Sequence, residues 1–174
     1  MTDRGEGPDT VQSTATSFEI LKRLREEGSA TLSEVANVLG LAKSTAHRHL
    51  ATLERLDLVV RENGTYHIAL RFLDFGEAAR SRWPYYDKVR DAVDTLATDT
   101  RERVQFIVAE HGVGVCLYRS SGKRAVDTSP AVGERMPLHA IASGKAILAL
   151  DDGLDFRGFV EDGIEAPTDH TITD

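Results

Sequence analysis

Residues 31–34 of the chain read Thr-Leu-Ser-Glu, which is the pattern of a capping box at the start of a helix. In such a box the hydroxyl of Thr31 accepts from the N–H of Glu34, and the Glu34 carboxylate accepts from the N–H of Thr31. The helix that begins here must be short, because Gly40 stands where a helix ends in a left-handed residue. The sequence therefore predicts a helix over Leu32–Leu39 that is followed by a tight turn.

A second helix is predicted directly after this turn, from about Ala42 to Leu56. Two helices joined by so tight a turn containing glycine are typical of a helix-turn-helix. Two predicted strands follow, Leu58–Arg61 and Tyr66–Leu70, and the Asn63-Gly64 pair between them is the strongest short-range hairpin signal. A hairpin directly after a helix-turn-helix is a wing, so the order of these elements predicts a winged helix-turn-helix.

The second of these helices has one apolar stripe and one polar face. At about 100° per residue, Ala46, Leu50 and Leu53 form the stripe that should be buried. The N-terminal part of this helix makes the base contacts in a helix-turn-helix, and an arginine there can bind guanine through two hydrogen bonds. We expect double-stranded DNA to be bound by a polar set on this helix and on the wing: Lys43, Ser44, Thr45, His47, Arg48, Arg55, Asn63 and Gly64.

The net charge of −7 argues at first against a nucleic-acid partner, but the distribution of charge matters more than the sum. Residues 42–71 carry five basic and three acidic side chains, whereas residues 151–174 carry one basic and eight acidic ones. The basic character is thus confined to the predicted helix-turn-helix and wing. The alternative is a merely solvated helix face; the capped helix, the tight turn and the wing in this order favour DNA reading.

The rest of the chain alternates between helical and strand periodicity, which indicates an α+β fold. Residues 1–10 are polar and lack the apolar core of an export signal, so a cytoplasmic location is expected. Trp83-Pro84 should end a helix. The remaining predicted helices are Val11–Glu27, Phe72–Arg82, Tyr85–Asp99 and Ala140–Leu150, and the strands are Val104–Glu110, Val113–Arg119 and Arg124–Ser129.

Several classes of site are not expected. No apolar run approaches the roughly 18 residues of a membrane span, so no membrane partner is expected. The single cysteine, Cys116, excludes an intramolecular disulfide, and its spacing from His111, His139 and His170 matches no metal site, so neither a metal nor another cofactor is expected. His139 and Ser143 have the spacing of a base and a nucleophile on one helix face but lack a third partner, so no enzyme is expected.

Two long motifs and two shorter ones resemble the IclR family of transcription regulators. Thr31–Ala36 with Gly40–Arg48 is similar to the helix-turn-helix of the family, and Val11–Ser13 is similar to the start of its first helix. Gly64–Tyr66 and Leu70–Leu73 resemble its wing and linker, and Gly133–Ala140 with Ala142–Ala146 resembles the signature of its effector domain. Ala42 stands where the family often has proline, a small departure at a helix start.

The resemblance implies a domain order. Residues 1–10, which are polar with glycine and proline, are expected to be a disordered leader. A winged helix-turn-helix follows over 11–71, with the helix-turn-helix at 31–56 and the wing at 57–70. A linker helix over 72–84 pairs protomers, and a GAF-like (profilin-like) effector-binding domain follows over 85–174. Family members continue past the segment that resembles Pro167–Asp174, so we expect this effector-binding domain to be incomplete.

The resemblance also implies a sequence-specific regulator of transcription, a repressor of local catabolic genes that forms homodimers or tetramers and responds to a small organic acid or an aromatic effector. Ala142, Ser143 and Gly144 match the family positions that approach the effector, and N–H groups at a helix start suit a carboxylate. Tight helix–sheet packing is the alternative for these small residues. Two other functions stay open: a DNA-binding module without effector response, and a GAF-like ligand-binding or interaction protein that does not read DNA.

Overall fold

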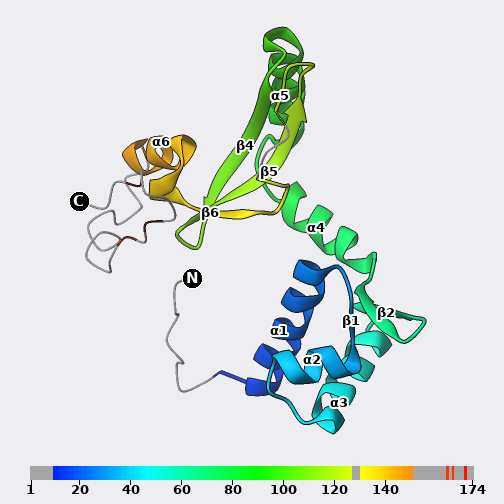
Figure 1. The fold of residues 1–174 in the computed structure, drawn as a ribbon. Helices are drawn as coiled ribbons and strands as arrows, with labels where there is room; N and C mark the ends of the chain where they lie inside the picture. The colour runs from blue at the N-terminus through cyan, green and yellow to red at the C-terminus, as the bar shows by residue number, and fades with distance from the viewer. Residues whose placement is uncertain (1–9, 127–129, 151–163, 165, 167–170, 172–174) are drawn as a thin grey trace. The chain divides into compact units, whose positions relative to one another are not determined.

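The computed structural model of the chain describes residues 10–126, 130–150, 164, 166 and 171. It divides the chain into two compact units, residues 1–79 and 80–174, each of which can be followed in Figure 1. The division lies inside the segment predicted to be a linker. The predicted leader, except for Thr10, and most of the acidic segment after Leu150 lie outside the described residues.

The first unit holds a helix-turn-helix followed by a small antiparallel sheet. Its strand order is β1-β3-β2, in which Ala30 pairs with Tyr66 and Arg61 pairs with the same tyrosine from the other side. Strand β1 was not predicted, because two residues are too few to show an alternation. The elements are α1 Gln12–Glu27, β1 Ala30–Thr31, α2 Leu32–Val38, α3 Lys43–Arg55, β2 Val59–Glu62, β3 Thr65–Ile68 and the start of α4 Arg71–Ser81.

The predicted ends of α2 are confirmed. The Glu34 N–H donates to the Thr31 hydroxyl at 3.3 Å, and the Thr31 N–H donates to the Glu34 carboxylate at 2.7 Å. Gly40 is left-handed with φ +63°, and the N–H of Leu41 donates to the Ala36 carbonyl at 2.8 Å. These bonds satisfy the backbone groups that a short helix leaves unpaired at its two ends.

We expect the capping box to contribute to the acid sensitivity of the first unit. Hydrogen bonds from the backbone and the side chain of Thr31 lower the pKa of Glu34. A carboxyl with a lowered folded-state pKa stabilises the fold above its unfolded pKa, and this contribution is lost as the pH falls through the folded-state value. We expect Glu34→Gln to lower the Tm at pH 7 and to make the fall in Tm between about pH 5 and pH 3 shallower, as measured by circular dichroism.

The exposed carboxyl of Glu54 on α3 provides a matched control, because it takes no part in a helix cap. Glu54→Gln should leave the slope of Tm against pH unchanged. Equal slopes for Glu34→Gln and the unaltered chain would show that the capping box does not contribute to acid sensitivity.

The core of the first unit lies between the three helices and the sheet. Helix α3 contributes Ala46, Leu50 and Leu53, which confirms the predicted buried stripe. These side chains meet buried apolar residues from every other element of the core: Ile20, Leu24, Ala30, Val35, Ala36, Val59 and Tyr66. Burial of this stripe fixes which face of α3 is left for solvent.

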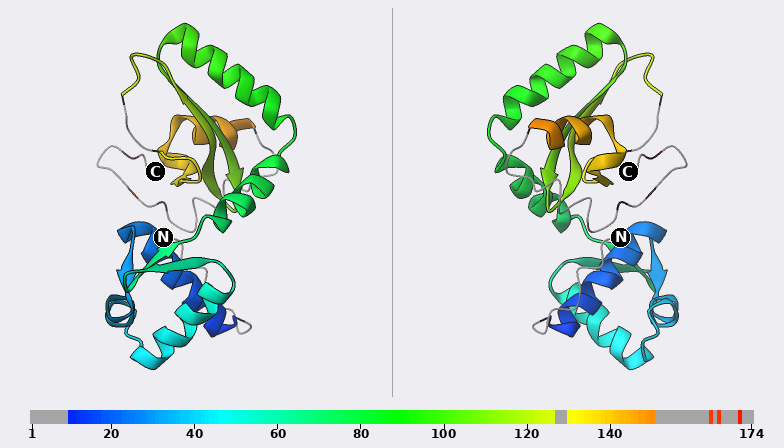
Figure 2. Two further views of the ribbon diagram at one scale, coloured as in Figure 1. Left: turned by 90° about the vertical axis from the view of Figure 1, so that its right-hand side faces the viewer. Right: turned by 90° about the vertical axis from the view of Figure 1, so that its left-hand side faces the viewer.

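The second unit is an antiparallel sheet with the order β4-β5-β6, and α5 runs along the β4–β5 pair (Figure 2). Val93 and Ala97 are the buried residues in the second half of α5. Cys116 is fully buried on β5, as expected of a cysteine in an apolar strand. The elements are α5 Tyr86–Thr100, β4 Arg103–Glu110, β5 Val113–Ser121, β6 Arg135–Pro137, the 3₁₀ helix η1 Leu138–Ala140 and α6 Ala142–Leu150.

The third strand was predicted in the wrong place. Residues 124–126 are not a strand, and 127–129 lie outside the described residues. After Gly122 the chain turns back on the end of α5, where the Arg124 N–H donates to the Arg101 carbonyl at 2.7 Å. The strand that pairs with β5 is Arg135–Pro137. It is three residues long and includes Pro137, which has no N–H and suits a sheet edge, so alternation could not reveal it.

The start of the last helix was also misplaced. The sequence predicts one helix from Ala140, whereas the structure has η1 followed by α6, with Ile141 extended between them. The close approach of the two segments explains the break. A Cβ at Gly144 would lie 2.1 Å from the carbonyl oxygen of Leu138, so α6 can pack against η1 only with glycine at this position.

Candidate nucleic-acid interface

Helix α3 leaves one polar face exposed, opposite the buried stripe. The tight turn at Gly40 precedes this helix, and the packing of its buried stripe in one core cluster with residues of α1 and α2 sets its rotation. The face keeps polar and cationic groups in solvent. Its predicted members are all accessible: Lys43, Ser44, His47, Arg48 and Arg55 are exposed, and Thr45 is half-buried.

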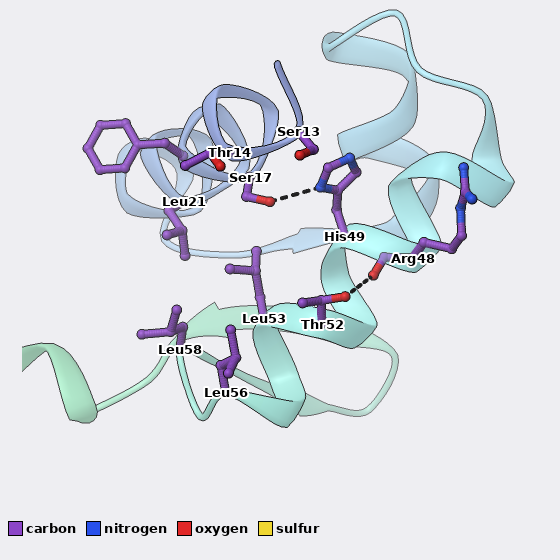
Figure 3. Close-up of a pocket in the computed structure, with 11 residues that line it drawn as sticks. Ser13, Thr14, Ser17, Leu21, Arg48, His49, Thr52, Leu53, Leu56 and Leu58 are labelled. Atoms are coloured by element: carbon purple, nitrogen blue, oxygen red, sulfur yellow. Dashed lines mark hydrogen bonds between the residues drawn. The ribbon is translucent and has the colours of Figure 1, made fainter. Parts of the chain in front are cut away.

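Arg48 lies near the middle of this face. Figure 3 shows its side chain directed away from α1. Within the part of the chain that the structure describes, no acidic side chain pairs with its guanidinium. The carbonyl of Arg48 accepts from the hydroxyl of Thr52 at 2.8 Å, so only its backbone is engaged. The guanidinium is therefore available for two parallel hydrogen bonds to a ligand.

The N-terminus of α3 can take an anion. Ala42 is the N-cap rather than the first helical residue, and it supplies no side-chain cap. The N–H groups of Thr45 and Ala46 donate back to the Ala42 carbonyl at 2.9 and 3.0 Å. The N–H groups of Lys43 and Ser44 precede these and point out of the first turn, where the helix dipole favours negative charge.

Two side chains that were not predicted hold α3 against α1. The hydroxyl of Ser17 and Nδ1 of His49 are 2.8 Å apart across the two helices (Figure 3). The pair spans 32 positions of the chain, so no local pattern could have shown it. Beside it is a groove of about 670 Å³ lined by Ser13, Thr14, Ser17, Phe18, Leu21, Arg48, His49, Thr52, Leu53, Leu56 and Leu58.

The wing has the predicted turn. Asn63 and Gly64 are both left-handed, with φ of +51° and +87°, as the tight hairpin turn requires. Both residues are exposed. Arg61, which was not among the predicted site residues, lies with its guanidinium 5.5 Å from the ring centroid of Tyr66. The wing thus carries a cation that is held over an aromatic ring.

Ala142, Ser143 and Gly144 form the first turn of α6 in the second unit. Ala142 is exposed, Ser143 is half-buried and Gly144 is buried. The contact of Gly144 with the Leu138 backbone gives this glycine a packing role, which was the alternative for the small-residue motif. An effector contact by these three residues stays a prediction.

The other groups that carry chemistry form no centre in the described residues. Burial raises the pKa of the Cys116 thiol, which lies 3.5 Å from the Tyr118 carbonyl oxygen. No three histidine, cysteine or acidic side chains of the described ranges gather as metal ligands, and His170 lies outside these ranges. None of the described helices combines the length and the apolar character needed to cross a membrane.

Two family models match most of the chain. The IclR helix-turn-helix domain matches residues 13–63. The C-terminal domain of the bacterial transcriptional regulator IclR matches residues 80–174. The first match contains α3 and ends at Asn63, the first residue of the wing turn, and the second contains the whole second unit.

Known proteins with similar sequences and structures agree with these matches. The chain is 32% identical over 146 residues to the probable HTH-type transcriptional regulator ArcR of Halobacterium salinarum, covering 82% of this chain and 56% of that protein. The chain thus spans little more than half the length of this relative. An IclR transcriptional regulator structure from Alicyclobacillus acidocaldarius aligns with a TM-score of 0.74 at 26% identity, covering 95% of this chain and 68% of that one.

A further solved structure shares the fold. An IclR homologue from Microbacterium hydrocarbonoxydans, crystallised in complex with 4-hydroxybenzoate, aligns with a TM-score of 0.70 at 24% identity. The alignment covers 93% of this chain and 68% of that chain. The two structures together confirm the α+β architecture of a helix-turn-helix unit followed by a sensing-domain sheet.

Proposed function

The chain belongs to the IclR family of transcriptional regulators, and from this premise we propose that it binds double-stranded DNA in a sequence-dependent way through the exposed face of α3. One observation carries the proposal: burial of Ala46, Leu50 and Leu53 leaves the opposite, polar and cationic face of α3 in solvent. Members of this family are regulators rather than enzymes.

The proposed contacts divide by chemistry. Arg48 binds a guanine edge in the major groove through two hydrogen bonds, because its guanidinium is exposed in the N-terminal half of α3. Lys43 and the N–H groups of the first turn bind phosphate. The rest of the major-groove surface is formed by Ser44, Thr45, His47 and Arg55. The wing turn at Asn63 and Gly64 contacts the DNA backbone.

The experiment is a binding titration of the intact chain. Labelled duplexes of overlapping sequence from the region upstream of its own gene are compared with scrambled duplexes of the same composition by fluorescence anisotropy. We expect one duplex to bind with a Kd of about 10⁻⁸ M or tighter, at least ~10³-fold tighter than its scrambled version. Equal affinity for all duplexes at every salt concentration would contradict the proposal.

A second function is an effector response in residues 80–174. The relative crystallised with 4-hydroxybenzoate favours a small carboxylate as effector, and the first turn of α6 can present N–H groups to it. We propose that Ala142 and Ser143 border this site, with Gly144 needed for the packing beneath. Calorimetry with 4-hydroxybenzoate tests this, and absence of heat at millimolar concentrations would favour a DNA-binding module without sensing.

We propose that two copies of the chain associate through α4. No residue of this helix is buried, and Leu73 and Phe75 are 70% and 51% exposed. A second copy of the chain would cover these side chains and give the two-fold arrangement that suits a palindromic site. A monomer in light scattering would contradict this. We also propose that the chain represses neighbouring catabolic genes and lies in the cytoplasm, where the chromosome is.

A further inference from the structure

Asp57, which follows the C-cap of α3, is an unfavourable residue type for its position. The N–H groups of Asp57 and Leu58 donate to the carbonyls of Glu54 and Leu53 at 3.0 and 2.9 Å, so the helix closes with a Schellman motif. Asp57 is the left-handed residue of this motif, with φ +57°. Glycine usually occupies this position, and a negative charge at the C-terminal end of a helix opposes the helix dipole.

The contacts of Arg71, the first residue of α4, explain why an aspartate is found at position 57. Nη1 of Arg71 donates to Oδ2 of Asp57 at 3.0 Å and to the carbonyl oxygen of Leu56 at 3.1 Å. Leu56 is the C-cap of α3, so a side chain of the next helix satisfies one of the carbonyls that α3 leaves free. The guanidinium also lies 6.0 Å from the ring centroid of Phe75, one turn further along α4.

Apolar burial does not fix the start of α4 to the first unit. None of its residues is buried, so apolar packing does not set its direction. The backbone before it is tied to β2 by the pairing of Ile68 with Val59, and to Leu58 by a hydrogen bond from the Ala69 N–H to the Leu58 carbonyl at 3.1 Å. The contacts of Arg71 with Leu56 and Asp57 add a polar side-chain link between the first turn of α4 and the end of α3.

We propose that Arg71 and Asp57 form a clamp that couples the direction of α4 to the position of the DNA-reading helix α3. This inference rests on the proposed function, because it assigns the clamp an effect on DNA binding. Arg71 is a positioning residue in this account and makes no contact with DNA. Since Arg71 lies in the first turn of α4, a change in the direction of this turn reaches α3 through the clamp.

Asp57→Gly in the intact chain gives the sharpest test, because local effects and the clamp predict opposite results. Glycine relieves the left-handed strain and removes a negative charge, so local effects alone predict unchanged or tighter DNA binding. Loss of the clamp predicts a Kd for the specific duplex that is about fivefold higher. Arg71→Ala should raise this Kd by a similar factor, and the double variant should bind no more weakly than either single one.

Two controls separate the clamp from charge. Arg25→Ala removes an exposed arginine from the far end of α1 and should leave the Kd within twofold. The slope of log Kd against log salt should be the same for Arg71→Ala and the unaltered chain, because the clamp touches no phosphate. A slope reduced by about 0.9 would make Arg71 a phosphate contact and would overturn the proposal.

A measurement without DNA distinguishes the two possible failures. Amide hydrogen exchange at Leu58 and Ala69 should be faster in Asp57→Gly and Arg71→Ala, while exchange at Leu24 in the core stays unchanged and shows that the variants fold. Absence of a specific complex with the unaltered chain would overturn the proposed function. Unchanged exchange at Leu58 and Ala69, or unchanged or tighter DNA binding by Asp57→Gly, would overturn the clamp.

Discussion

Arg48→Ala is expected to weaken the specific DNA complex by about 1–3 kcal/mol, or roughly 5- to 150-fold in Kd. The side chain is exposed on the face of α3 opposite the buried stripe, and no acidic group of the described residues pairs with it. Binding to a scrambled duplex should change only a few-fold, because that complex depends on phosphate contacts. Anisotropy titrations on both duplexes measure the two effects side by side.

The matched variant is Arg48→Lys. Lysine keeps the charge but loses the planar fork that binds two acceptors of guanine at once. We expect it to lose most of the preference for the specific duplex and to keep the affinity for scrambled DNA. If Arg48→Ala weakened both complexes equally, Arg48 would be a phosphate contact and the reading role would be wrong.

Leu50→Ala is expected to lower the free energy of unfolding of the first unit by about 2–5 kcal/mol. Leu50 is fully buried at the centre of the α3 stripe, where it packs in the cluster that contains Ile20 and Leu24. Its truncation removes apolar contacts and leaves a cavity that neighbouring side chains fill only in part. Specific DNA binding should weaken with it, since α3 is held in place by the same packing.

The two units need not unfold together, so the measurement must report on the first unit alone. Native-state hydrogen exchange at the slowest amides of α1 and α3 does so. Leu56→Ala provides the comparison, because Leu56 is 54% exposed just after the same helix, and it should cost less than about 1 kcal/mol. A loss below 1 kcal/mol for Leu50→Ala would contradict the packing described above.

The parts of the fold that follow from local rules could be predicted from the sequence. A capping box, a glycine that ends a helix and an Asn-Gly turn each act within a few residues, so Thr31, Gly40 and Asn63 indicated the right structures. The helical period of α3 is also a local rule, and it placed Leu50 on the buried face and Arg48 on the exposed face. The sequence alone therefore predicts which face of α3 is exposed.

The parts that depend on distant partners could not be predicted. The edge strand Arg135–Pro137 is defined by its pairing with β5 rather than by its own three residues. The Ser17–His49 contact and the Arg71–Asp57 pair join positions 32 and 14 residues apart, and neither leaves a periodic signal. Gly144 matched a motif, but only the close approach of the Leu138 backbone shows why a side chain is not tolerated there.

Amide chemical-shift changes on titration with the specific duplex test most directly the claim that the exposed face of α3 reads DNA. We expect the largest changes on Lys43–Arg48 and on Asn63-Gly64, and only weak changes at these residues with a scrambled duplex. Changes that are equally large for both duplexes, or that are concentrated in residues 86–121 of the second unit, would contradict it.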